Sequence, residues 1–159
     1  MITLKKACAV AAAVGICAGA LTTLPASAAP REGHIYNKQT DLFLSPGPYD
    51  SLDVEEFGRS GEWELRTPPG AAADVYQLKL KGTNLCIKAL TPADVGLVEC
   101  VANPGKPQRW FVTAGTGHWG TIQSRQYPGH FLGTTGGPVQ LVETQQLDAP
   151  VLWRFAEEG

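Results

Sequence analysis

The sequence contains a single methionine among 159 residues, and only 18% of its residues are charged. Its 13 basic and 15 acidic residues nearly cancel, for a net charge of −2, and the basic residues form no cluster. A nucleic-acid partner would need a basic face to meet its phosphates, so we expect no such partner. Glycine and proline are plentiful instead, at 18 and 12 residues, which disfavours a helical bundle. The composition therefore predicts a loop-rich, all-β protein.

Sequence motifs of catalysis are also missing. The chain contains no G-x-S-x-G, no H-E-x-x-H, no phosphate-binding loop and no glycine-rich run that opens a helix pattern, as a dinucleotide fingerprint requires. Its three histidines, His34, His118 and His130, are scattered and lack the spacing of metal ligands. We therefore expect a protein that is not an enzyme and that uses neither a cofactor nor a metal ion.

Only the N-terminus carries a long apolar run. Two lysines precede the alanine-rich segment 7–21, and an A-x-A cleavage pattern follows at 26–28. The run is short for the ~30 Å hydrocarbon core of a membrane, and it ends in small residues and proline. Residues 1–28 are therefore predicted to be a secretory signal peptide, cleaved after Ala28 or Ala29. We expect a secreted, extracellular protein without a membrane anchor.

Removal of the signal peptide leaves residues 29–159 as one domain with two cysteines, Cys86 and Cys100, and a net charge of −4. In an oxidising compartment such a pair forms a disulfide by default, and two cysteines alone are too few for a metal site. Closing a loop of this size is worth about 3 kcal/mol in the chain-entropy model. The sequence thus predicts a stabilising Cys86–Cys100 bridge.

Apolar residues recur along the domain at a spacing of 43 to 47 residues. Three series fall at the centres of expected strands and tryptophans make a fourth: Ile35, Leu78 and Ile122; Leu44, Ile87 and Leu132; Val54, Leu97 and Leu141; Trp63, Trp110 and Trp153. Each unit alone would expose an apolar face, so three units must share one core. This pattern predicts a β-trefoil of twelve short strands with repeats at about 33–68, 74–115 and 118–158. A two-sheet sandwich is the alternative, but it gives no reason for the repeat. We expect the trefoil to be a monomer.

Residues outside the apolar series follow the same spacing. Asp41, Asn84 and Gly129 each stand three places before a second-strand centre. These residue types tolerate a left-handed backbone, so we expect them in the tight turns of the hairpins. The repeated tryptophans are predicted to fill the shared core. Trp119 lies outside their series and is the one tryptophan that we leave as a candidate surface contact.

The second repeat carries a longer pattern: Cys86-Ile87-Lys88, then Val95-Gly96-Leu97-Val98-Glu99-Cys100, then Gln108-Arg109-Trp110. Over residues 75–112 this resembles the ricin B-chain-like lectin family, whose repeat has a C-[LI]-D, V-x-L-x-x-C and Q-x-W signature. The resemblance implies the trefoil fold and carbohydrate binding. The family's sugar-binding aspartate and its aromatic partner are not matched; their positions hold Ser45, Lys88 and Gly133, and Glu55, Val98 and Val142. We expect a structural role for Gln108, within its hairpin.

A displaced sugar site is therefore the first functional hypothesis. A sugar pocket needs an apolar platform and a few convergent polar groups. Tyr127, His130 and Gln140 offer such groups in the third repeat, and Tyr49 is an aromatic candidate in the first. The sequence thus predicts a secreted, non-catalytic module that recognises an extracellular glycan at a non-standard site.

The alternative hypothesis is a trefoil protease inhibitor. Arg66-Thr67-Pro68-Pro69-Gly70 joins the first two repeats, where Kunitz-type trefoils place their reactive loop. Two prolines stiffen this segment, which lowers the entropy lost on binding. Arg66 would fill the acidic specificity pocket of a trypsin-like enzyme. In this reading the partner is an extracellular protein, a protease, bound by the loop of Arg66, Thr67 and Pro68.

Overall fold

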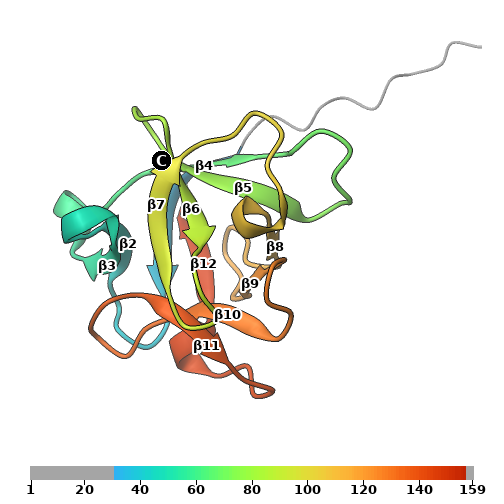
Figure 1. Ribbon diagram of the computed structural model, residues 1–159. Helices are drawn as coiled ribbons and strands as arrows, with labels where there is room; N and C mark the ends of the chain where they lie inside the picture. Colours follow the sequence, from blue (N-terminus) through green and yellow to red (C-terminus); the bar gives the residue numbers. More distant parts are fainter. Residues whose placement is uncertain (1–30, 157–159) are drawn as a thin grey trace, which may run out of the picture.

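Twelve short strands and four single-turn 3-10 helices make up residues 31–156, which are the residues that this computed structural model describes (Figure 1). The strands are β1 (Arg31–Asn37), β2 (Phe43–Pro46), β3 (Leu52–Glu55), β4 (Trp63–Arg66), β5 (Val75–Leu80), β6 (Leu85–Ala89), β7 (Val95–Glu99), β8 (Trp110–Val112), β9 (Ile122–Ser124), β10 (His130–Gly133), β11 (Gln140–Glu143) and β12 (Trp153–Ala156). The 3-10 helices are η1 (Pro48–Asp50), η2 (Phe57–Arg59), η3 (Lys106–Gln108) and η4 (Ala149–Val151). The predicted signal peptide, residues 1–28, lies outside the described residues. No helix within residues 31–156 has the length and apolar character that a membrane span requires.

Six antiparallel strands form the barrel. Strand β1 pairs with β12 and β4, β4 with β5, β5 with β8, and β8 with β9. Gly120 closes the ring, because its N–H and carbonyl bond the carbonyl and N–H of Trp153 at 2.9 and 2.8 Å. A Cβ at Gly120 would lie 2.4 Å from the backbone of Thr113, so only glycine permits this close approach. Closure leaves the barrel without an unpaired sheet edge.

Three hairpins cap one end of the barrel: β2–β3, β6–β7 and β10–β11. Figure 1 shows the first at the left, the second at the front and the third at the bottom. Their tips are joined by backbone hydrogen bonds. The N–H of Leu141 donates to the carbonyl of Ala93, and that of Val139 to the carbonyl of Leu52, both at 2.9 Å. The cap is therefore one hydrogen-bonded unit.

The three tryptophans of the apolar series occupy equivalent places. Each is fully buried, and each indole N–H donates to a backbone carbonyl of the second strand in its own repeat. The acceptors and distances are Leu44 at 3.0 Å for Trp63, Ile87 at 3.0 Å for Trp110, and Leu132 at 2.8 Å for Trp153. The other three apolar series are buried in the same core. The predicted β-trefoil with a pseudo-threefold axis is confirmed.

The predicted disulfide is also confirmed. Cys86 of β6 is bonded to Cys100, which directly follows β7. The N–H of Cys100 donates to the carbonyl of Asn84 at 2.8 Å, so the bridge and the backbone hold the two strands together at the same end. The second repeat therefore has a covalent link between the strands of its own hairpin.

One turn prediction is wrong. Asp41 and Gly129 have the expected positive φ, at 55° and 82°, but Asn84 does not; Gly82, at 75°, takes the left-handed conformation in the second repeat. The turn between β5 and β6 is organised by Thr83, whose hydroxyl donates to the carbonyl of Leu80 at 2.8 Å and accepts the N–H of Leu85 at 3.0 Å. With this side-chain turn, the left-handed residue is Gly82, two places nearer the N-terminus than the predicted Asn84.

Candidate functional site

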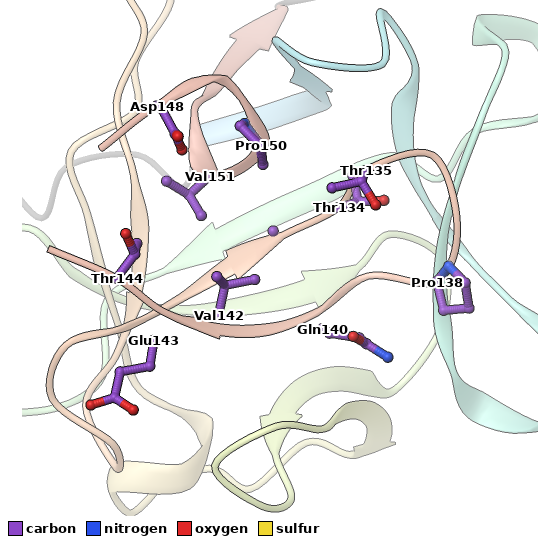
Figure 2. A pocket seen from close by; sticks show the side chains of 11 residues that line it. Thr134, Thr135, Pro138, Gln140, Val142, Glu143, Thr144, Asp148, Pro150 and Val151 are labelled. Carbon is purple, nitrogen blue, oxygen red and sulfur yellow. The ribbon is translucent and has the colours of Figure 1, made fainter. Parts of the chain in front are cut away.

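A hollow of about 330 Å³ opens in the third repeat between the hairpin β10–β11 and helix η4. Figure 2 shows Val142 and Val151 facing each other across its middle, with Asp148 and Thr144 toward one end and Thr135 toward the other. Val151 is buried and Val142 half-buried, so the two valines form an apolar floor. We refer to this cavity as the third-repeat hollow.

Gly133 lets the two valines of the floor approach its backbone closely. A Cβ on Gly133 would lie 2.9 Å from Cγ2 of Val142 and 3.0 Å from Cγ1 of Val151, so the two valines close around the glycine. The N–H of Thr134 donates to the carbonyl of Pro150 at 3.1 Å and ties η4 to the hairpin. The hydroxyl of Thr134 donates to a carbonyl of the adjoining loop at 2.8 Å. The walls are thus held by internal bonds.

Three polar side chains around the opening have no partner within the described part of the chain. Within residues 31–156 the side chains of Thr135, Gln140 and Asp148 make no hydrogen bond or ion pair with another residue, and all three are exposed. An apolar floor with a few unpaired polar groups at its edge is the arrangement that small ligands require. The carboxylate of Asp148 and the amide of Gln140 can accept and donate hydrogen bonds to hydroxyl groups of a ligand.

The structure brings together only part of the predicted constellation. The rings of Tyr127 and His130 are in contact, with centroids 6.0 Å apart. In the β10–β11 ladder, however, His130 is opposite Glu143, whereas Gln140 is opposite Gly133 at the other end. Gln140 therefore lines the third-repeat hollow without the two rings, and Tyr127 packs against the core. The hairpin register, which spacing alone does not define, separates them.

Tyr49 lies apart from both groups. It belongs to η1, at the tip of the β2–β3 hairpin, and its side chain is fully exposed. Its φ of 55° places it in the left-handed region, which is uncommon for a residue other than glycine. The structure offers it no neighbouring aromatic ring within the described residues. Tyr49 is thus a single exposed ring.

The predicted inhibitory segment begins on the sheet. Arg66 is the last residue of β4, paired with Gln77 of β5, and its guanidinium donates two hydrogen bonds to Glu64, at 3.0 and 2.8 Å. Pro68 is buried. Thr67 lines a cavity of about 400 Å³ together with both neighbours. Arg66 is therefore exposed, and its guanidinium is bonded to a carboxylate of its own strand.

Glu64 also receives Lys79, whose Nζ lies 3.3 Å from the carboxylate. Burial acts to raise the pKa of Glu64, but the hydrogen bonds from Arg66 and Lys79 outweigh it and hold this pKa below its ordinary value. The three side chains form an ion-paired cluster on the outer face of β4 and β5. The guanidinium of Arg66, which an inhibitor would present to a protease, is thus ion-paired within this cluster.

Comparisons with known proteins address the fold. No protein-family model matches the sequence, and no curated protein matches it either. A GlcNAcα1-4Gal-releasing endo-β-galactosidase from Clostridium perfringens is similar in structure, with a TM-score of 0.66 at 15% identity over 80% of this chain and 33% of that chain. ThreeFoil, a designed 3-fold symmetric protein, has a TM-score of 0.60 at 12% identity over 80% of this chain and 99% of that chain.

These similarities support the β-trefoil and extend no further, because one fold serves many functions. The chain spans about a third of the length of the galactosidase that it matches. The resemblance to ricin B-chain-like lectins is supported only at the level of the fold, since no family model matches.

Asp148 and Val151 were not among the residues predicted for the site. A signal for Val151, though not for Asp148, was present in the sequence. The position two places before each repeated tryptophan holds Gly61, Gln108 and Val151. In the third repeat this position holds an apolar residue, Val151, and the family's aspartate position holds Gly133. Neither of the other two repeats combines these features.

Proposed function

We propose that this protein is a secreted, non-catalytic carbohydrate-binding module and that the third-repeat hollow is its sugar site. The observation that carries the proposal is the combination of an apolar floor, Val142 and Val151, with the unpaired polar side chains of Gln140 and Asp148. A pyranose presents an apolar face of C–H groups and a rim of hydroxyls, which matches this arrangement. Extracellular location is supported by the signal-peptide pattern of residues 1–28 and by the disulfide.

The structural neighbour adds a ligand class to test. The name of the Clostridium perfringens enzyme specifies a GlcNAcα1-4Gal unit, so galactose- and N-acetylglucosamine-containing oligosaccharides are the first probes. The volume of the third-repeat hollow, about 330 Å³, is at the lower end of the range for small-molecule pockets. One or two sugar rings fit this size better than a long chain.

The arrangement of the carboxylates that line the third-repeat hollow favours binding without catalysis. Hydrolysis of a glycoside uses two carboxyl groups that face each other across the bond, about 5–10 Å apart. Glu143 and Asp148 both line the third-repeat hollow, but Figure 2 shows the Glu143 side chain directed away from its middle. Among the residues that line the cavity, Asp148 then provides the one carboxylate near its middle, where hydrolysis would need two.

The test is a glycan array followed by calorimetric titration of the best neutral ligand. Asp148→Asn and Gln140→Ala are each expected to weaken binding about tenfold or more, because each removes hydrogen bonds to ligand hydroxyls. Gln126→Ala is the matched control, since Gln126 is an exposed glutamine outside the cavity. It is expected to bind like the unaltered protein.

Two results would count against the proposal. Neutral-glycan binding that is unchanged in both Asp148→Asn and Gln140→Ala would exclude the third-repeat hollow as the site. Release of a sugar from the bound oligosaccharide, abolished by Glu143→Gln, would show an enzyme instead of a binding module.

A further inference from the structure

Four aromatic rings form a continuous strip, and none of them lines the third-repeat hollow. They belong to Phe57 of η2, Phe43 of β2, Tyr36 of β1 and Trp119, which precedes β9. Consecutive ring centroids along this order are 5.4, 4.9 and 5.7 Å apart. Phe57 is 57% exposed and the other three rings are half-buried. We refer to these four residues as the aromatic strip.

Two cations surround the Trp119 end of the aromatic strip. Arg154 is the β12 partner of Tyr36, and its guanidinium carbon lies 4.9 Å from the ring centroids of both Tyr36 and Trp119. Nζ of Lys38 lies 5.8 Å from the Trp119 ring. Within residues 31–156 neither cation has an ion pair or a side-chain hydrogen bond.

The ring contacts leave the donors of these cations available. A guanidinium stacked on an aromatic face keeps the N–H groups at its edge free for an anion. Lys38 is exposed and has three further donors. Two unpaired cations beside a half-buried tryptophan therefore offer both an apolar platform and an anion site.

Acidic groups near the aromatic strip are arranged unevenly. Asp41 accepts the hydroxyl hydrogen bond of Tyr36 at 2.7 Å, and this bond raises the pKa of Tyr36. Glu55 is opposite Phe43 in the β2–β3 ladder, and Glu56 directly precedes η2. Glu55 and Glu56 thus lie near the Phe57 end together with Arg59 of η2, whereas the Trp119 end has two cations, Arg154 and Lys38, and one carboxylate, Asp41, which Tyr36 engages. A ligand that carries a negative charge is favoured at the Trp119 end, where cations outnumber carboxylates.

We propose that the Trp119 end of the aromatic strip binds an acidic sugar, a pyranose that carries a carboxylate. The sugar's apolar face would pack against the exposed part of the Trp119 indole that Arg154 leaves uncovered, and its carboxylate would accept hydrogen bonds from Arg154 and Lys38. This second site depends on the proposed function only in the class of ligand, a carbohydrate. It shares no residue with the third-repeat hollow. The net negative charge of the whole chain disfavours general attraction of polyanions, so selectivity comes from this local pair.

The experiment compares trigalacturonic acid, an acidic probe, with galactotriose, a neutral one, by calorimetry. Lys38→Ala and Arg154→Gln are each expected to weaken binding of the acidic probe tenfold or more and to leave neutral binding unchanged. Lys106→Ala, an exposed lysine away from the aromatic strip, is the control and is expected to have no effect. Higher salt is expected to weaken only the acidic probe. Trp119 fluorescence gives a second readout, because the other three tryptophans are fully buried.

The variants of the two sites separate the two proposals. Loss of neutral binding in Asp148→Asn, with no binding of trigalacturonic acid to the unaltered protein, would overturn the acidic site and support the third-repeat hollow. Acidic binding that survives both Lys38→Ala and Arg154→Gln would also overturn it. A single-stranded oligothymidylate that binds more tightly than trigalacturonic acid would replace the sugar by a nucleic acid and overturn the ligand class. Acidic binding lost only in Lys38→Ala, Arg154→Gln and Trp119→Ala would support it.

Discussion

The second and third repeats have the same fold, but the space beneath the hairpin is bridged by a buried glutamine in the second repeat and is hollow in the third. In the second, the carboxamide of Gln108 is buried and spans from hairpin to barrel: its amide donates to the carbonyl of Glu99 at 2.9 Å, and its oxygen accepts from Gln77 and from the N–H of Val101 at 2.8 and 3.2 Å. In the third, the same position holds Val151, which makes no such bonds and forms the floor of a cavity. The predicted structural role of Gln108 is confirmed.

This difference shows how a symmetric fold acquires one distinct site. The second repeat uses its polar groups internally and adds a disulfide, so it stabilises the trefoil. The third repeat has neither the glutamine nor the bridge, and its polar groups remain available to a ligand. The tryptophan bonds are the same in all three repeats, so they support the fold in each without marking a site.

Removal of the disulfide is expected to have the largest effect. The double variant Cys86→Ala with Cys100→Ala should lower the free energy of unfolding by about 3 kcal/mol, because the unfolded chain regains the entropy of the closed loop. Urea unfolding followed by fluorescence measures this change. Sugar binding at the third-repeat hollow should persist under native conditions, since the bridge lies in another repeat. Loss of both together would contradict the separation of roles.

Gln108→Val, which makes the second repeat like the third, is expected to lower the free energy of unfolding by about 2 kcal/mol. It leaves the N–H of Val101 without its acceptor and removes one bond of Gln77, and groups left unsatisfied in a buried place are costly. The same unfolding assay tests it, with Gln126→Val as an exposed control. A change no larger than that of the control would show that the Gln108 bonds contribute no net stability.

Val151→Gln makes the converse change and should act on binding more than on stability. A glutamine there is expected to reach across the third-repeat hollow as Gln108 does in the second repeat, and to fill the volume that a sugar needs. Affinity for the neutral ligand should fall about tenfold, equivalent to ~1.4 kcal/mol. Calorimetry measures this fall, and circular dichroism checks the fold. Unchanged affinity would place the sugar elsewhere.

The smallest effect is expected at the ion-paired cluster of Glu64. Because the pKa of Glu64 is lowered in the folded state, its contribution to stability is present above the ordinary glutamate pKa and is lost as pH falls toward the lowered value. Glu64→Gln should therefore cost about 1 kcal/mol or less at neutral pH and less still in acid. Unfolding curves of both proteins at neutral and acidic pH measure the difference. A gap that widens in acid would contradict the assigned direction.

Much of the fold was predictable from the sequence. The spacing of Trp63, Trp110 and Trp153 and of the apolar strand centres indicated three equivalent units, and burial of those residues follows from strand alternation. The disulfide followed from a count of two cysteines in the domain that remains after the predicted signal peptide. The turn at Asn84 was not predictable from the repeat, because the hydroxyl of Thr83 reorganises it locally.

The candidate site was only partly predictable. Gln140 was named, but it was grouped with Tyr127 and His130, which lie toward the opposite end of the same hairpin. The pairing of the two strands, and not their order in the chain, decides which side chains share an end. Trp119 was left as a candidate surface contact, whereas its contacts with Tyr36 and Arg154 depend on how β1, β12 and the segment before β9 meet at the barrel closure.

The sequence by itself determined the threefold trefoil, its tryptophan core and its disulfide, because these depend on residue spacing and on the drive to bury apolar side chains in one shared core. Only the tertiary structure decided where the chain is hollow and where its rings and cations gather. Those features join residues from different strands and repeats, and their distances are set by barrel closure and by strand register.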